Sequence, residues 1–325
     1  MNYLKYSDVS LVPRYSECMS RSDCSTEVKF GNNKFKLPVV PSNMKSVINF
    51  NLAKWMSKNN YFYIMHRFDH DLRDFVSTAN KEQWNNISFS CGVKSKDKKL
   101  IDDIAIKKYR VDYITIDIAH GHSIRMKQMI RHIKSCLNNV TIIAGNVATQ
   151  QAVVDLYSWG ADYVKVGIGQ GSPCTTKDKT GFTMPMFSCV SACSNLYSGG
   201  FDENDPEVKI PIIADGGIKC NGDIAKALSA GACMVMAGGL FAACSDSPAA
   251  FNSVNGSSFK AYFGSASFEN TGNKNHVEGK LTNIPGNNMT YSSKLLEIHQ
   301  DLQSAISYSG GTDLSIFNKV ESIVV

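Results

Sequence analysis

The chain has 325 residues, of which 43% are hydrophobic and 19% are charged, and its formal net charge is +5. This length accommodates two small domains or one large α/β barrel, and the ordinary composition excludes a disordered or low-complexity chain. The basic residues are scattered, no apolar signal segment begins the chain, and the ten cysteines lack zinc-ligand spacing. We therefore expect a soluble cytoplasmic protein with free thiols that binds an anionic small molecule, and neither nucleic acid nor a membrane.

Short apolar segments alternate with segments of helical spacing along the chain. After an N-terminal arm at residues 1–37, eight candidate strands lie at 38–43, 61–66, 87–93, 113–118, 140–146, 163–167, 211–215 and 233–237. Amphipathic segments lie between them at 47–59, 98–108, 123–137, 149–159 and 223–230. This alternation predicts one domain over 1–325, a (β/α)8 TIM barrel. The alternative is an open doubly wound sheet, which the lack of a GxGxxG sequence after the first strand disfavours.

Two connections are unusually long. One follows residue 169 and leads into a segment at 186–197; the other, at 242–291, precedes a last helix near 294–307. The polar, glycine-bearing tract at 263–280 predicts a flap over the mouth of the barrel, and a plain surface excursion is the alternative.

Polar and glycine residues recur where the candidate strands end. Asp117, Gly169, Asp215-Gly216-Gly217 and Gly238-Gly239 all occupy such positions. These ends meet on the carboxyl face of a barrel, where barrel enzymes carry their active sites. The glycines after the last two strands favour a phosphate site, and Asp215 suits ribose hydroxyls; simple turn chemistry is the alternative for the glycines.

Cys174 stands in the glycine-rich loop that follows the strand at 163–167. Hydroxyls of Thr175 and Thr176 and the cation of Lys177 follow it directly. Such surroundings favour a thiolate nucleophile, although a lone cysteine is more often a small buried apolar residue.

Eight motifs together resemble the family of IMP dehydrogenases and GMP reductases, and within it the short bacterial-type reductases. They are NYFYIMHRF, YITIDIAHGHS, IAGNV, KVGIGQGSPCTTKDKTGF, PIIADGGI, YFGSAS, VEGK and DLQSAISYSGG, and they cover nearly the whole chain. The resemblance implies a homotetrameric (β/α)8 barrel of purine salvage. Its activity would be NADPH-dependent reductive deamination of GMP to IMP and ammonia through a covalent Cys174 thioimidate.

The resemblance also assigns individual residues. Cys174 would be the nucleophile, and Thr176 and Glu278 would handle protons for the departing ammonia. The substrate positions are Asp215, Gly216, Gly217, Gly238, Gly239, Gly264, Ser265, Ala266 and Gly279. The cofactor positions are Ser20, Arg21, Arg67, Asp117, Ile118 and Ala119, with the N-terminal arm serving a neighbouring subunit. Carbonyls of Gly169, Gly171 and Cys174 would hold a potassium ion.

Two other functions stay open from the sequence. An IMP dehydrogenase of this family would carry an Arg-Tyr pair on the flap and a regulatory insertion, and residues 267–280 contain neither arginine nor tyrosine. A non-catalytic purine-nucleotide-binding protein is the second alternative. The chain departs from the family pattern at Gln170, where proline is usual, and at Asn275, near where some relatives place arginine.

Overall fold

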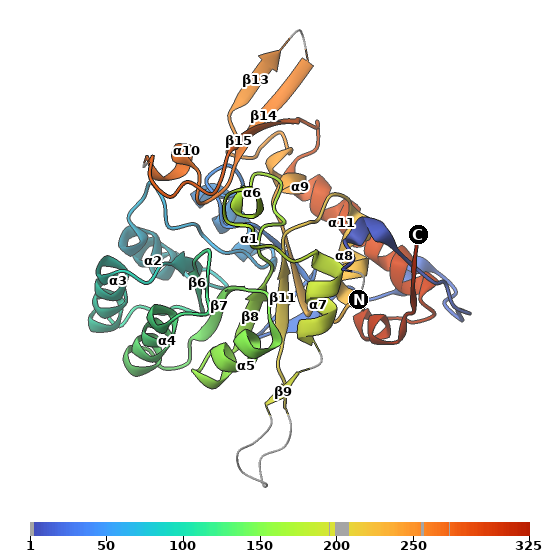
Figure 1. Ribbon diagram of the computed structural model, residues 1–325, viewed down its shortest axis with the longest axis horizontal. Coiled ribbons are helices and arrows are strands. Elements are labelled where there is room, and N and C mark those ends of the chain that lie inside the picture. The colour runs from blue at the N-terminus through green and yellow to red at the C-terminus, as the bar shows by residue number, and fades with distance from the viewer. Residues whose placement is uncertain (1–2, 195, 199–207, 255–256, 273) are drawn as a thin grey trace.

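A seven-stranded parallel sheet forms the centre of the computed structural model, which describes residues 3–194, 196–198, 208–254, 257–272 and 274–325 (Figure 1). Its strands run in the order β4-β12-β11-β8-β7-β6-β5, and all neighbouring pairs are parallel. They are β4 (Val39–Pro41), β5 (Ser88–Cys91), β6 (Tyr113–Asp117), β7 (Thr141–Val147), β8 (Tyr163–Val166), β11 (Ile212–Asp215) and β12 (Met234–Ala237). Seven of the eight expected strands are thereby confirmed in place.

The remaining expected strand, at 61–66, differs from the prediction. It joins the sheet through one parallel bridge between Met65 and Phe89, with the Met65 N–H donating to Ser88 O at 3.1 Å. In the part of the chain that the structure describes, it forms no ladder with β4. Side-chain packing holds it instead, because Phe62 and Ile64 are fully buried inside the curled sheet.

The interior of the sheet is a single apolar cluster to which several strands contribute. Val40 of β4, Ile143 of β7 and Ile213 of β11 pack there with Phe62 and Ile64. Successive residues of a strand face opposite sides of the sheet, and those on the outer side, such as Val164 of β8, belong to the larger cluster between the sheet and the helices. The chain is therefore an α/β protein with a curled parallel sheet, consistent with a TIM-barrel-like fold.

Helices cover the outside of the sheet. Figure 1 shows α2, α3, α4 and α5 in one outer layer. The long helices are α1 (Phe50–Lys58), α2 (Leu72–Lys81), α3 (Ser95–Ile106), α4 (Ile124–Cys136), α5 (Gln150–Ser158), α7 (Met186–Ser194), α8 (Asn221–Ser229) and α11 (Tyr291–Tyr308). Side-chain caps define the beginnings of several of them, as where Ser123 accepts from the Met126 N–H and Thr149 from the Ala152 N–H. The sequence analysis did not predict α2, although Leu72, Phe75, Val76 and Ala79 give it one buried face.

The long connection at 242–291 contains secondary structure that the sequence did not predict. Strands β13 (Phe251–Val254), β14 (Ser257–Phe263) and β15 (Leu281–Pro285) form an antiparallel sheet that projects from the body. The short helices α9 (Gly239–Ala242) and α10 (Phe268–Thr271) lie before and within it.

Short elements at the termini complete the fold. β1 (Val9–Leu11) pairs with β16 (Ser322–Val324), and the hairpin of β2 (Val28–Phe30) and β3 (Asn33–Phe35) carries two phenylalanines into the inner cluster. The remaining elements are η1 (Tyr6–Asp8), η2 (Arg21–Asp23), α6 (Thr176–Thr180), β9 (Tyr197–Ser198), β10 (Val208–Lys209) and η3 (Leu314–Lys319).

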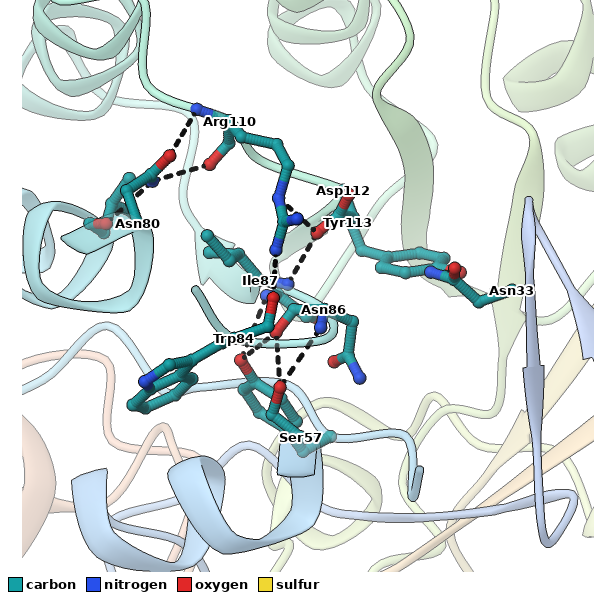
Figure 2. A network of polar contacts seen from close by, with 12 residues as sticks. Asn33, Ser57, Asn80, Trp84, Asn86, Ile87, Arg110, Asp112 and Tyr113 are labelled. Atoms are coloured by element: carbon teal, nitrogen blue, oxygen red, sulfur yellow. Dashed lines mark hydrogen bonds and ion pairs between the residues drawn. The ribbon is translucent and has the colours of Figure 1, made fainter. Parts of the chain in front are cut away.

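A polar network fixes the amino ends of β5 and β6 (Figure 2). Asp112 Oδ2 accepts from the Ile87 N–H at 2.7 Å and lies 3.5 Å from Arg110 Nε. The Arg110 guanidinium also donates to Trp84 O, and Asn80 Nδ2 donates to Arg110 O at 2.9 Å. Burial raises the pKa of Asp112. This network anchors the end of the sheet opposite to the residues considered next. No helix in the described ranges is long and apolar enough to cross a membrane.

Candidate active site

Three side chains form a continuous hydrogen-bonded array after β8. The thiol of Cys174 donates to Thr176 Oγ1 at 3.2 Å, and the Thr176 hydroxyl donates to Glu278 Oε2 at 2.6 Å. Glu278 is 102 residues away from Thr176 in the sequence. The short O–H···O distance is typical of a hydrogen bond to a carboxylate. The array can carry a proton between the sulfur and the carboxylate through one hydroxyl.

Backbone hydrogen bonds hold the two segments of this array together. The Thr175 N–H donates to Glu278 O at 2.9 Å, and the Lys280 N–H donates to Pro173 O at the same distance. Cys174 and Gly279 form an antiparallel bridge between them. A Cβ at Gly279 would lie 2.9 Å from the Ser267 amide nitrogen, so only glycine fits this approach. The position of the carboxylate is thus set by main-chain contacts.

Several of the predicted substrate positions surround the thiol loop. A Cβ at Gly264 would lie 3.5 Å from the Pro173 ring, and one at Gly216 would lie 3.3 Å from the Gly171 nitrogen. Gly216 has a φ of +110°, which allows the loop after β11 to turn toward the loop after β8. Gly238 and Gly239 begin α9, and Gly238 packs on Met44 and Tyr262.

A buried lysine that the sequence analysis did not single out connects two of the predicted site residues. Lys165 Nζ lies 2.8 Å from Asp117 Oδ1 and 2.5 Å from Asp215 Oδ2, and its side chain is 2% exposed. Lys165 Nζ also donates to the side-chain oxygen of Asn146. Asn43 Nδ2 donates to Asp117 Oδ2 at 3.0 Å. Asn146 Nδ2 donates to Asp215 Oδ2 at 2.9 Å.

The charges of this cluster support one another. Burial alone would raise the pKa of Asp117, but the Lys165 ammonium, the Arg67 guanidinium and the hydrogen bonds together hold it below its ordinary value. Burial would likewise lower the pKa of Lys165, whereas the two carboxylates raise it. The lysine therefore stays protonated and both aspartates keep fixed positions at the carboxyl ends of β6 and β11. The signal that could have found Lys165 is its place in β8, on the same side as Tyr163, which faces the inner cluster.

The predicted cofactor positions fall into two separate groups. Arg67 donates from Nη2 to Asp117 O at 3.1 Å, and its Nε is buried without a partner in the described part of the chain. Ile118 is joined to Gly145 O through its N–H at 3.0 Å. Arg21 lies elsewhere, with its guanidinium 5.2 Å from the centre of the Tyr308 ring on α11. Within one chain, the arm residues Ser20 and Arg21 are not brought to Arg67.

The predicted cation loop is a tight turn. The Cys174 N–H donates to Gly171 O at 3.0 Å, which leaves this carbonyl one further lone pair. Gly169 has a φ of +75°. Gln170, which replaces the usual proline, donates from Nε2 to Thr183 Oγ1 at 2.7 Å, so a side-chain hydrogen bond now restrains this position.

These features define an α/β enzyme in which a cysteine, a threonine and a glutamate are hydrogen-bonded in series after strand β8 of a curled parallel sheet. A family model described as "IMP dehydrogenase / GMP reductase domain" matches residues 3–324, and the chain belongs to this family. It is 45% identical to a GMP reductase of Leptothrix cholodnii, over 100% of this chain and 97% of the relative. A GMP reductase of Mesoplasma florum is 46% identical, over 98% of this chain and 97% of the relative's own length. A GMP reductase of Staphylococcus carnosus is 44% identical, over 100% of this chain and 97% of the relative's own length.

Proposed function

We propose that this protein is a GMP reductase, which converts GMP and NADPH into IMP, ammonia and NADP⁺. The observation that carries the proposal is the array of Cys174, Thr176 and Glu278, with its two contacts of 3.2 Å and 2.6 Å. The relatives named above, all called GMP reductase and similar over nearly their full length, support the same reaction. The flap segment 267–280, without arginine or tyrosine, favours reduction over the dehydrogenase reaction.

In the first half of the reaction the amino group leaves the purine. The Cys174 sulfur forms a bond to C2 of GMP, and the thiol proton passes through the Thr176 hydroxyl to Glu278. The bond from C2 to the amino nitrogen then breaks, and the same proton returns from Glu278 to the leaving nitrogen, which departs as ammonia. The result is a thioimidate between Cys174 and the purine, with all atoms and charges balanced.

In the second half the covalent bond to the enzyme is broken. The nicotinamide cofactor, when bound, would supply the hydride that C2 accepts. Glu278 and Thr176 return a proton from solvent to the Cys174 sulfur as the bond from sulfur to C2 breaks. Arg67 and Asp117 would lie on the cofactor side, and the Arg67 Nε, which has no partner among the described residues, gives a donor for an anionic or carbonyl group there.

Further parts of the proposal concern the architecture and the setting. We infer that residues 61–66 complete the set of eight strands in a (β/α)8 barrel. The barrel forms one domain, with an arm at 1–37 and a flap at 242–291. The separation of Ser20 and Arg21 from Arg67 supports a homotetramer in which the arm serves a neighbouring subunit. Carbonyls of Gly169, Gly171 and Cys174 would bind potassium. The ten free cysteines favour a cytoplasmic setting, and the scattered basic residues disfavour a nucleic-acid partner.

Replacement of the nucleophile tests the proposal. Cys174→Ala should bind GMP in calorimetry with an affinity close to that of the parent and show no oxidation of NADPH. Cys220→Ala is the matched control, because Cys220 is exposed on another loop and should retain full turnover. Turnover by the Cys174 variant at a rate near the parent's would overturn the mechanism.

A further inference from the structure

Three side chains with metal-ligating atoms meet on the outer layer of helices. They are Asp102 of α3 and His132 and Cys136 of α4, and their ligand atoms all lie within 4.8 Å of one another. His132 Nε2 is 2.8 Å from Asp102 Oδ1. The Cys136 sulfur is 3.7 Å from Asp102 Oδ1 and 3.8 Å from His132 Nε2. We propose that these three residues form a surface site for Zn²⁺, with water completing the coordination.

The helical spacing explains why the two ligands of α4 converge. His132 and Cys136 are four residues apart, so their side chains lie on the same face of the helix. That face is turned toward α3, which lies beside α4 in the outer layer (Figure 1). Asp102 completes the triangle from the neighbouring helix. A metal here would therefore connect two helices that otherwise meet through side-chain packing.

The distances between the three ligand atoms are near those of a tetrahedral zinc site. Bonds of about 2.0 to 2.3 Å place the ligand atoms of such an ion about 3.3 to 3.6 Å apart. The two contacts of sulfur, at 3.7 Å and 3.8 Å, are slightly longer than this, and the contact between Asp102 and His132, at 2.8 Å, is shorter. Side-chain rotations that move atoms by about 0.5 Å correct all three separations.

The donor set and the exposure also suit this ion. An imidazole nitrogen and a thiolate sulfur favour zinc over magnesium or calcium. The negative charges of the thiolate and the carboxylate together balance the double positive charge of the zinc ion. The side chains of His132 and Asp102 are 25% and 46% exposed, which leaves an open path for the ion and for a bound water. Because Cys136 ends α4 just before β7 begins, the site lies toward the amino ends of the strands, away from Cys174.

Metal titration of the full chain tests this inference. All variants carry Cys174→Ala, so that the nucleophile binds no metal. Zn²⁺ is titrated in competition with a chromophoric chelator, and Co²⁺ is used to detect a thiolate-to-cobalt charge-transfer band. The parent should bind one tight equivalent. Cys136→Ser and His132→Gln should weaken it by at least about tenfold, as loss of even a supporting residue does at metal sites.

Matched controls separate this site from other thiols and imidazoles. Cys220→Ser and His120→Gln change exposed residues of the same types and should leave the tight equivalent and the cobalt band unchanged. The metal-free melting temperatures of all variants check that each is folded, and Asp102→Asn gives a third ligand variant. Equal zinc affinity in the parent and the ligand variants, or a cobalt complex without a thiolate band, would mean that the cluster is only hydrogen-bonded and would overturn the proposal.

Discussion

Replacing Lys165 with methionine should destabilise the protein strongly at neutral pH. Its ammonium contacts two carboxylates, Asp117 at 2.8 Å and Asp215 at 2.5 Å, and is almost completely buried. Methionine keeps much of the volume but leaves both carboxylates without their cation. Removal of one partner from a buried ion pair costs about 3 to 5 kcal/mol, and two anions are left here, so we expect a loss at the upper end of this range.

The effect of pH gives the same prediction a second readout. In the parent, Lys165 and the neighbouring groups hold the pKa of Asp117 below its ordinary value of 3.8, so the pair contributes stability above that pH and loses it as the pH falls through the folded pKa. In Lys165→Met, burial acts without the cation and raises the pKa of Asp117. Protonation then relieves the variant, and its deficit should shrink as the pH falls from about 7 toward about 4.

Urea denaturation of both proteins at these pH values measures the free energy of unfolding. Lys134→Met is the control, since Lys134 pairs with Asp162 at 3.2 Å but both side chains are well exposed, at 42% and 39%. Such a surface pair is worth about 0 to 1 kcal/mol. A deficit for Lys165→Met no larger than that of the control, or one that grows on acidification, would refute the assignment of Lys165 as the charge that holds this cluster.

Three further predictions concern the array, its backbone and a buried histidine. Thr176→Val should lower kcat by about 10²- to 10⁴-fold with little change in GMP affinity. The control is Thr175→Val, which should keep a kcat near the parent's because the buried hydroxyl of Thr175 has no partner among the described residues. Equal effects of the two substitutions on kcat would argue against a proton path through Thr176. Gly279→Ala should lose about 1 to 3 kcal/mol in urea unfolding, because its methyl would lie 2.9 Å from the Ser267 nitrogen, and an unchanged stability would contradict the close approach. Burial lowers the pKa of His66 from 6.5 to about 3, so between these pH values the unfolded chain binds a proton that the folded chain does not. The free energy of unfolding should therefore fall by up to about 1.4 kcal/mol for each unit by which the pH is lowered in this range. His66→Asn should flatten this slope in urea melts at two pH values, and an equal slope in the two proteins would refute the reasoning.

The strands of the sheet could be predicted because each is a short apolar run between polar ends. The exception is the segment at 61–66, whose apolar pattern is right but whose backbone makes only one bridge to β5. An apolar sequence pattern predicts that side chains are buried, and Phe62 and Ile64 are buried as expected. The same pattern does not predict whether both edges of a segment form hydrogen bonds with neighbouring strands, because this depends on the curvature of the whole sheet.

The candidate site was predictable where residues are neighbours in sequence or match a family motif. Cys174 and Thr176 are two positions apart, and the VEGK motif pointed to Glu278, but their distances required the folded backbone. Lys165 was missed because a single lysine in an apolar strand reads as an edge or a surface residue. Only the arrangement of Asp117 and Asp215, at the carboxyl ends of β6 and β11 on either side of β8, explains why a charge is buried there.

The central claim is tested most directly by nicotinamide absorbance in two parallel assays, one with GMP and NADPH and one with IMP and NAD⁺, both with potassium present. Our account predicts that NADPH is oxidised in the first assay, that one ammonia and one IMP appear for each NADPH consumed, and that the second assay stays silent. Reduction of NAD⁺ in the second assay, or GMP binding without turnover in the first, would contradict the assignment of this chain as a GMP reductase.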